Sequence, residues 1–265
     1  MFFSLNSLLL ALILSAIVLG AVVLGLLAGR ALARHGETLK EPLGIVQGAL
    51  LTLVALILAF GLAMAVSRYE SRRAAVVDET NAIGTAYLRA QTLQEPARSQ
   101  SLPLYKLYTD AAIRLADTVP GSTAQKRVIV VESGLQRRLW RLAGESLAAQ
   151  PDHSAPRLYV DSLNAMIDMQ TTRVSALNNR VPFAILLVEV LGAALALGLL
   201  SFYLALLSRG VVTVLLAGGL ITLVLYVTFD LDRPTRGLIT IPTDPLVALR
   251  ASMELPPAAA APRPR

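Results

Sequence analysis

The 265-residue chain contains no cysteine and only two histidines, His35 and His153. The absence of cysteine excludes disulfide bonds and thiol chemistry. Two scattered histidines without a thiolate argue against a zinc or other transition-metal centre. The sequence also lacks a glycine-rich phosphate loop followed by Lys and Ser or Thr, and it lacks a nucleophile paired with a base. We therefore expect no enzyme activity, no bound metal and no cofactor.

Charge is scarce as well, because 16% of the residues are charged and 55% are hydrophobic. A soluble domain has about a quarter charged residues. The apolar residues gather in four blocks that approach or exceed the roughly 20 residues needed to cross a bilayer. These blocks are Leu8 to Ala28, Leu43 to Val66, Pro182 to Leu207 and Val211 to Phe229. The sequence thus predicts a polytopic membrane protein with four transmembrane helices.

The first block begins near the N-terminus, as the apolar part of a signal peptide would. No Lys or Arg precedes it, and it is longer than the about 7–15 apolar residues of a signal peptide. The sequence "AGRALA" that follows resembles a cleavage site. We nevertheless interpret the block as a membrane anchor.

The polar segment between the second and third blocks, 67–181, has a helical pattern. Apolar residues recur at steps of three and four from Val128 to Leu142, and again from Leu163 to Leu177 with a polar gap at Gln170. Proline and glycine interrupt the pattern between these stretches. We expect an uninterrupted second helix from Leu43 to Gly84, then helices at 103–118, 122–149 and 156–180. Because strand alternation is absent, the predicted fold class is all-α.

The chain therefore divides into four regions. Residues 1–66 hold transmembrane helices 1 and 2, and 67–181 form a helical region that we expect to be cytosolic. Residues 182–229 hold transmembrane helices 3 and 4, joined by a tight turn at 208–210. A tail follows at 230–265, and its end, "ELPPAAAAPRPR", is expected to be disordered.

Orientation follows from the basic residues near the membrane ends. One side carries Arg68, Arg72, Arg73, Arg173, Arg180, Arg233 and Arg236, and the other carries Arg30, Arg34, Lys40 and Arg209. The larger number predicts that both termini and 67–181 are cytoplasmic. The net charge of +6 fits anionic lipid headgroups, and we expect no nucleic-acid partner.

Three groups of side chains stand out by their spacing. Thr52, Leu56 and Phe60 are four residues apart and share one face of the second helix, where packing or lipid contact is the simplest reading. Arg68 and Arg72 also share a face, and their mutual repulsion favours a nearby anion, acid or lipid phosphate. The alternative is headgroup anchoring with a Glu70–Arg73 pair. The run Ala21, Gly25, Gly29 predicts close approach of another helix, within the chain rather than between chains.

Glu189 lies about two turns inside the third apolar block. A carboxylate in hydrocarbon is costly, so we expect it to face the protein interior or water. It would then act in proton coupling or pore lining, or it would be a protonated side chain bonded to a neighbouring helix, or one that reaches water near the headgroups. A second polar group follows the fourth block and is typical of a helix stop. Its members are Asp230, Asp232, Arg233 and Pro234.

The stretch "AVSRYESRRAAVVDETNAIG" resembles the end of the second transmembrane helix of bacterial bestrophin-type channels. Arg68-Tyr69-Glu70 with Arg72 or Arg73 takes the place of a block rich in aromatic residues and arginine, and Asn81 takes the place of its asparagine. The chain is more similar to the bestrophin-like family of bacterial membrane proteins. That family has the same two-plus-two helix layout and an "LDRP…G" signature, which here is Leu231 to Pro234 followed by Gly237.

The resemblance implies a homo-oligomeric channel for chloride or other small anions in the bacterial inner membrane. Its hydrophobic neck would fall on Leu56 and Phe60, with Thr52 on the same face. The sequence departs from bestrophins in lacking their paired tryptophans and an acidic cluster that would hold Ca²⁺. The alternatives are a non-conducting scaffold or sensor that carries a helical module, and a proton-coupled transporter in which Glu189 faces a cavity.

Overall fold

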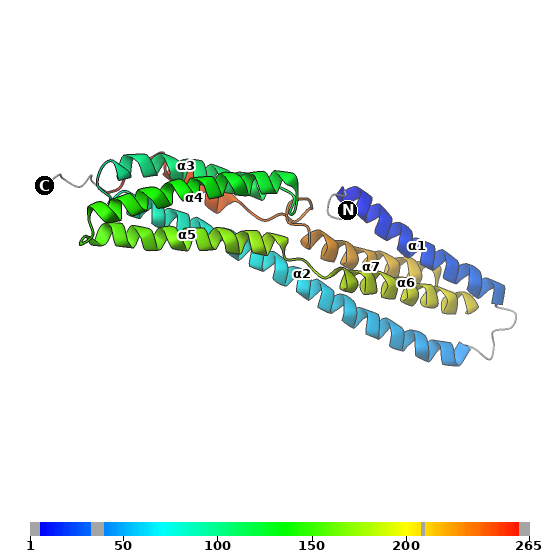
Figure 1. The fold of residues 1–265 in the computed structure, drawn as a ribbon. Coiled ribbons are helices and arrows are strands. Elements are labelled where there is room, and N and C mark those ends of the chain that lie inside the picture. Colours follow the sequence, from blue (N-terminus) through cyan, green and yellow to red (C-terminus); the bar gives the residue numbers. More distant parts are fainter. Residues whose placement is uncertain (1–5, 33–39, 208–209, 260–265) are drawn as a thin grey trace. The chain divides into compact units, whose positions relative to one another are not determined.

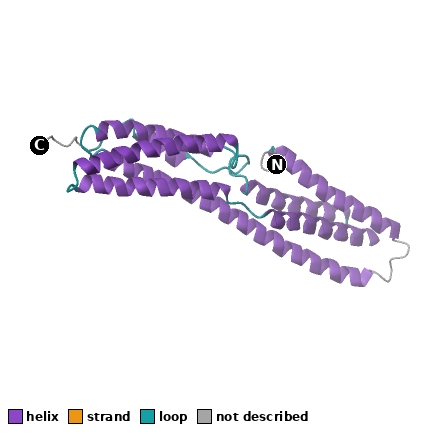
Figure 2. Ribbon diagram, viewed as in Figure 1, coloured by secondary structure: helices purple, strands orange, loops and turns teal. Residues whose placement is uncertain are grey.

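A computed structural model of the chain describes residues 6–32, 40–207 and 210–259. These residues form helices and contain no strand (Figures 1 and 2), which confirms the all-α prediction. The helices are α1 (Ser7–Leu32), α2 (Lys40–Ala90), α3 (Ala97–Ala116), α4 (Thr123–Ala149), α5 (Ser154–Asn178), α6 (Phe183–Leu206), α7 (Val211–Leu231) and α8 (Asp244–Ser252).

Each of the four apolar blocks lies in a helix long and apolar enough to cross a bilayer, namely α1, α2, α6 and α7. The prediction of four transmembrane helices is thereby confirmed. The second helix is unbroken from Lys40 to Ala90. It covers the whole of the predicted span from Leu43 to Gly84, and it also includes Pro42 in its first turn and six residues beyond Gly84. Arg34, His35 and the 208–209 part of the predicted turn lie outside the described residues.

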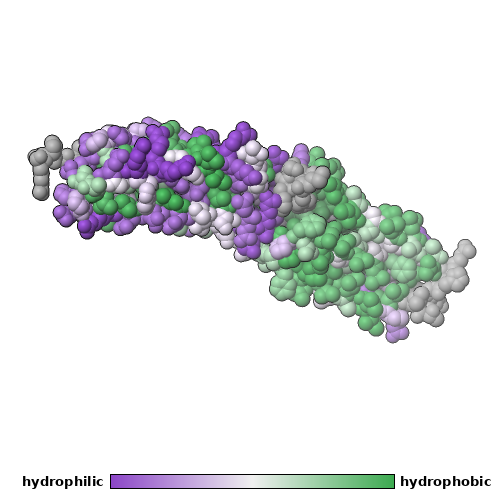
Figure 3. All heavy atoms as spheres, viewed as in Figure 1, coloured by the Kyte–Doolittle hydropathy of each residue, from purple (hydrophilic) through white to green (hydrophobic). Residues whose placement is uncertain are grey.

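The chain divides into two compact units, and the division falls inside α2. The first unit, called here the apolar unit, is Met1–Tyr69 with Arg180–Thr240. The second, called the polar unit, is Glu70–Asn179 with Ile241–Arg265. On the face drawn in Figure 3, hydrophobic residues dominate the apolar unit and hydrophilic residues cover most of the polar unit.

Glycines allow α1 to pack closely on α6 in the apolar unit. A Cβ atom at Gly25 would lie 2.1 Å from the carbonyl oxygen of Gly198, and one at Gly29 would lie 2.5 Å from that of Phe202. Backbone atoms have no freedom to move aside, so these positions require glycine. The small-residue run of α1 therefore serves packing inside the chain, as its spacing predicted.

The polar unit contains the second part of α2 with α3, α4, α5 and α8 around a common core. Tyr105, Leu139 and Leu163 are fully buried there. Helix α3 begins at Ala97, earlier than the predicted residue 103, and it includes Pro103. Ala97, Ser101 and Leu104 are buried, so tertiary packing extends the helix to residues before the proline.

Helix α8 has no counterpart in the expected elements, because nine residues give too little pattern to predict. It joins the polar unit through Leu246, which is completely buried. The first residues of the proline- and alanine-rich end also make contacts, since Lys106 donates to Glu254 at 2.9 Å and the amide of Ala259 donates to Gln91 at 3.0 Å. Disorder was expected for the whole stretch 254–265, of which residues 260–265 lie outside the described residues.

Candidate functional site

The predicted neck face of α2 is exposed within the single chain. Leu56 is 53% exposed and Phe60 is 67% exposed, whereas Val54 and Leu58 on the same helix are buried in the core of the apolar unit. The hydroxyl of Thr52 donates to the carbonyl of Gly48 at 3.0 Å. This bond satisfies the one polar side chain of the face, so the face offers a hydrophobic surface.

A shallow groove of about 310 Å³ lies beside Phe60, between α2 and α6. Its α2 wall includes Phe60 and Gly61, and its α6 wall includes Ile185 and Val188. The lining is almost wholly apolar, as expected for a surface inside a membrane.

Glu189 of α6 is completely buried and lies against α2. A Cβ atom at Gly61 would lie 1.3 Å from the carboxyl oxygen Oε1. Neither oxygen of Glu189 has a hydrogen-bond partner among the described residues. The carboxyl group thus occupies the space that the missing side chain of Gly61 leaves open.

The Arg-Tyr block is divided between the two units. In the apolar unit, Tyr69 packs half-buried against the core, and Arg68 is half-buried with its Nε atom lacking a hydrogen-bond partner among the described residues. In the polar unit, Arg73 pairs with Glu70 at 3.8 Å, both well exposed, and Asn81 is exposed. Exposed pairs of this kind contribute roughly 0–1 kcal/mol.

Arg72 has a structural position in the polar unit. Its side chain is buried, and it donates to the carbonyl oxygens of Ala176 at 3.3 Å and Asn179 at 2.7 Å. The carbonyl of Ala176 lies in the last turn of α5 and that of Asn179 directly follows the helix, at the end where the helix dipole is negative. Arg72 therefore caps α5, a role that its spacing from Arg68 did not reveal.

The residues after α7 form a compact turn that is stabilised by hydrogen bonds to two aspartates, Asp230 and Asp232. Oδ2 of Asp230 accepts hydrogen bonds from the amides of Leu238 at 2.8 Å and Ile239 at 3.0 Å. Oδ1 of Asp232 accepts one from the amide of Val181 at 2.9 Å, which joins the end of α7 to the residues before α6. Arg233 and Pro234 are buried. The signature after helix 4 is thus part of the architecture of the apolar unit.

A buried polar cluster in the polar unit was not found from the sequence. Arg173 of α5 donates to Glu79 of α2 at 2.5 Å and to the carbonyl of Ala112 at 3.0 Å. Gln170 donates to Glu132 of α4 at 3.0 Å. Two features of the sequence could have revealed this cluster: the polar gap at Gln170, and the position of Glu132 within the apolar repeat of α4.

Glu132 is completely buried, and its Oε1 has no hydrogen-bond partner among the described residues. Burial and the nearby charge of Glu79 raise the pKa of Glu132 from 4.5 to about 7, against the opposing effects of Gln170 and Arg173. The polar unit thus contains an acid that titrates near neutral pH. No three His, Asp or Glu side chains form a metal-binding group in the part of the chain that the structure describes.

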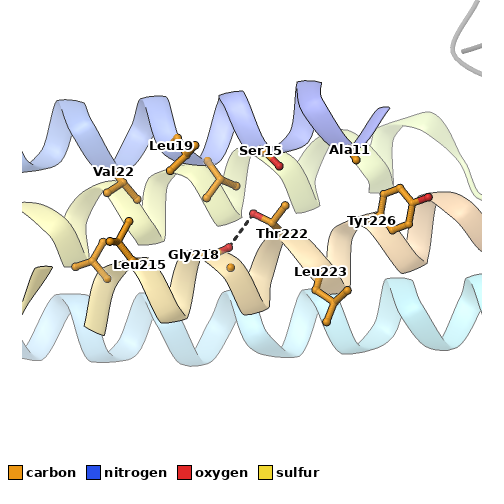
Figure 4. Close-up of a pocket in the computed structure, with 12 residues that line it drawn as sticks. Ala11, Ser15, Leu19, Val22, Leu215, Gly218, Thr222, Leu223 and Tyr226 are labelled. Atoms are coloured by element: carbon orange, nitrogen blue, oxygen red, sulfur yellow. Dashed lines mark hydrogen bonds between the residues drawn. The ribbon is translucent and has the colours of Figure 1, made fainter. Parts of the chain in front are cut away.

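A second groove, of about 480 Å³, runs between α1 and α7 (Figure 4). Small residues such as Ala11, Ser15 and Gly218 open it. The hydroxyl of Thr222 donates to the carbonyl of Gly218 at 2.7 Å, so it offers no free donor to a ligand. This groove contains none of the residues singled out in the sequence.

Comparisons with known proteins agree with this architecture. A family model described as "Bestrophin-like domain" matches residues 11–246. No curated protein matches the chain. Among solved structures, a bacterial bestrophin homologue from Klebsiella pneumoniae solved by zinc phasing is 15% identical, with a TM-score of 0.61 over 89% of this chain and 95% of that one.

A tryptophan-to-alanine form of the Klebsiella homologue is 17% identical, with a TM-score of 0.62 over 89% of this chain and 94% of that one. At such identities the similarity establishes the fold alone. The family match covers most of the chain. The protein is therefore a member of the bestrophin-like family.

Proposed function

We propose that several copies of the chain form an anion channel in the bacterial inner membrane, with the Thr52–Leu56–Phe60 face of α2 as its hydrophobic neck. The observation that carries the proposal is the exposure of this face. Phe60 is two-thirds exposed, and Leu56 is about half exposed, although the opposite side of the helix is well packed. We expect further copies of the chain to contact this one, so that their α2 faces together line a pore.

The chemistry of the face fits a gate rather than a binding site. A ring of leucine and phenylalanine side chains blocks ions by excluding water, and it conducts when the ring widens enough to hydrate. Arg68 lies two turns beyond Phe60 on α2 and is half-buried, so its positive charge favours chloride or other small anions near the mouth. The polar unit and both termini are proposed to be cytoplasmic.

The test is anion flux from liposomes that hold the purified full-length protein. Phe60→Ala and Leu56→Ala are expected to raise flux above wild type, because a smaller neck is easier to wet. Phe183→Ala is the matched control, because Phe183 of α6 is a phenylalanine in the same unit with 71% exposure. It is expected to leave flux unchanged.

A cross-linking experiment tests the assembly itself. The natural chain has no cysteine, so Phe60→Cys supplies a unique thiol. If the face surrounds a symmetry axis, a short bis-maleimide links copies through residue 60 but not through residue 183 in Phe183→Cys. If no variant conducts and folded, inserted protein forms no cross-links, the channel proposal is wrong. The protein is then better described as a non-conducting scaffold or sensor.

A further inference from the structure

Glu189 of α6 contacts α2 at the residue that directly follows Phe60 of the proposed neck. Its carboxyl group touches Gly61, and Gly61 follows Phe60 in the sequence. Both residues line the groove between α2 and α6. The carboxyl group is therefore separated from the groove only by a residue that has no side chain.

The surroundings of Glu189 offer its charge no compensation. Both carboxyl oxygens are buried and lack hydrogen-bond partners among the described residues. The other charged and titratable groups on the described helices of the apolar unit are Arg30 on α1, Lys40, Glu41, Arg68 and Tyr69 on α2, Tyr203 on α6, and Tyr226 and Asp230 on α7. Among the side chains that the structure describes, none is hydrogen-bonded to Glu189.

The geometry observed here is suited to the neutral carboxyl group. An unpaired carboxylate in an apolar environment costs far more free energy than a neutral acid, unless water or a donor reaches it. Gly61 lines the groove between α2 and α6, so this groove is the opening that adjoins the carboxyl group. Movement of the carboxylate in that direction separates α2 from α6 at Gly61, and it displaces Phe60, which forms the wall of the same groove.

We propose that Glu189 is a proton-binding site that controls the neck. With the proton bound, the carboxyl group lies against Gly61 and α2 packs on α6. When the proton leaves to water through the groove, the carboxylate moves toward the groove and the position of Phe60 changes. The effect on conduction rests on the proposed channel function, whereas the movement of α2 does not.

The first measurement is therefore independent of ion flux. A spin label on Phe60→Cys in full-length protein in nanodiscs reports the mobility of this part of α2 from acid to alkaline pH. The spectrum is expected to change with a single midpoint, and the change is expected to be lost in Phe60→Cys with Glu189→Gln. Glutamine has nearly the same shape as glutamic acid but does not titrate.

Two further variants make the assignment specific. Glu70→Gln changes an exposed glutamate of α2 that pairs with Arg73, and it is expected to retain the transition. Gly61→Ala places a methyl group where the carboxyl group lies, so it is expected to shift the midpoint or change the spectrum of the acid form. A pH-independent spectrum in the wild-type background, or a transition that survives Glu189→Gln, overturns the proposal.

Flux measured over the same pH range separates the two proposals. Flux that follows the spectral midpoint and loses its pH dependence in Glu189→Gln supports both. A spectral transition that depends on Glu189 in a protein without flux keeps the proton site and contradicts the channel. Flux that is insensitive to pH, in a protein whose spectrum is also insensitive, keeps the channel and contradicts the proton site.

Discussion

Asp230 and Gly237 are in direct contact across the turn that follows α7. A Cβ atom at position 237 would lie 2.6 Å from Oδ1 of Asp230, while the other carboxyl oxygen holds the amides of Leu238 and Ile239. The glycine is therefore needed so that the chain can fold closely over the carboxylate. This contact gives Gly237 a structural role, because its lack of a side chain lets the turn close over the carboxyl group of Asp230.

Gly237→Ala is expected to destabilise the apolar unit. The added methyl group displaces the carboxylate and weakens two hydrogen bonds to a charged acceptor, at a cost of about 1.5–3 kcal/mol for each bond that is lost. A lower thermal midpoint in detergent micelles is the expected result. Gly219→Ala is the control, since nothing lies within 4 Å of a Cβ atom there. Equal midpoints for the two variants would contradict this account.

Substitution of the α1 glycines is expected to disrupt the contact between α1 and α6. Gly25→Ala and Gly29→Ala each drive a methyl group into a backbone carbonyl, and such overpacking costs about 1–3 kcal/mol or more. Gly20→Ala on the same helix meets no atom within 4 Å and should be neutral. Thermal unfolding of the three variants measures the difference, and a Gly20→Ala variant as destabilised as the other two would contradict the packing account, because alanine has the higher helix propensity.

Glu132 makes the stability of the polar unit depend on pH. Its pKa is about 7 in the folded chain against an ordinary value of 4.5, so the folded chain holds a proton that the unfolded chain releases between these values. Stability from this group is highest below about pH 4.5, falls as the pH rises toward 7, and is constant above it. The difference in pKa corresponds to roughly 3 kcal/mol.

Glu132→Gln removes this dependence while keeping an oxygen that accepts from Gln170. The variant is expected to be more stable than wild type at alkaline pH and similar to it in acid. Denaturant unfolding at several pH values, followed by the near-ultraviolet signal of the tyrosines, measures the difference between the two proteins. A difference that stays constant with pH would contradict the assignment.

Removal of the buried Arg173 is expected to be more costly than removal of its whole ion pair. Arg173→Met leaves Glu79 buried without its partner, which typically costs about 3–5 kcal/mol. The double variant Arg173→Met with Glu79→Gln removes the stranded charge and is expected to recover part of the loss. A double-mutant cycle on thermal unfolding gives the coupling free energy between Arg173 and Glu79. Additive losses of stability would show that the ion pair contributes little.

The proposed orientation has a direct test in a chain without cysteine. Ala124→Cys lies on an exposed position of α4, and Ala31→Cys lies at the exposed end of α1. In spheroplasts, a membrane-impermeant maleimide is expected to label residue 31 and to spare residue 124 until the cells are permeabilised. The reverse pattern would place the polar unit outside the cytoplasm.

The sequence by itself determined the membrane class, the four spanning helices and most helix limits. These features depend on local properties: the length of an apolar run, the period of three to four residues, and the breaks made by proline and glycine. The same local logic located Glu189 inside a span and the small-residue run on α1. The alternative interpretation of the arginine block included the pair between Arg73 and Glu70, which the structure contains because the two residues lie within one turn of helix.

Only the tertiary structure decided which groups meet. Arg72 caps α5 more than a hundred residues later, Glu79 pairs with Arg173, and Glu189 lies against Gly61. Such contacts depend on how each helix is rotated about its axis and which helix packs beside it, and one sequence does not specify these through spacing. Helix α8 likewise required the tertiary structure. Its nine residues are stabilised by the burial of Leu246 and have no periodic apolar pattern of their own.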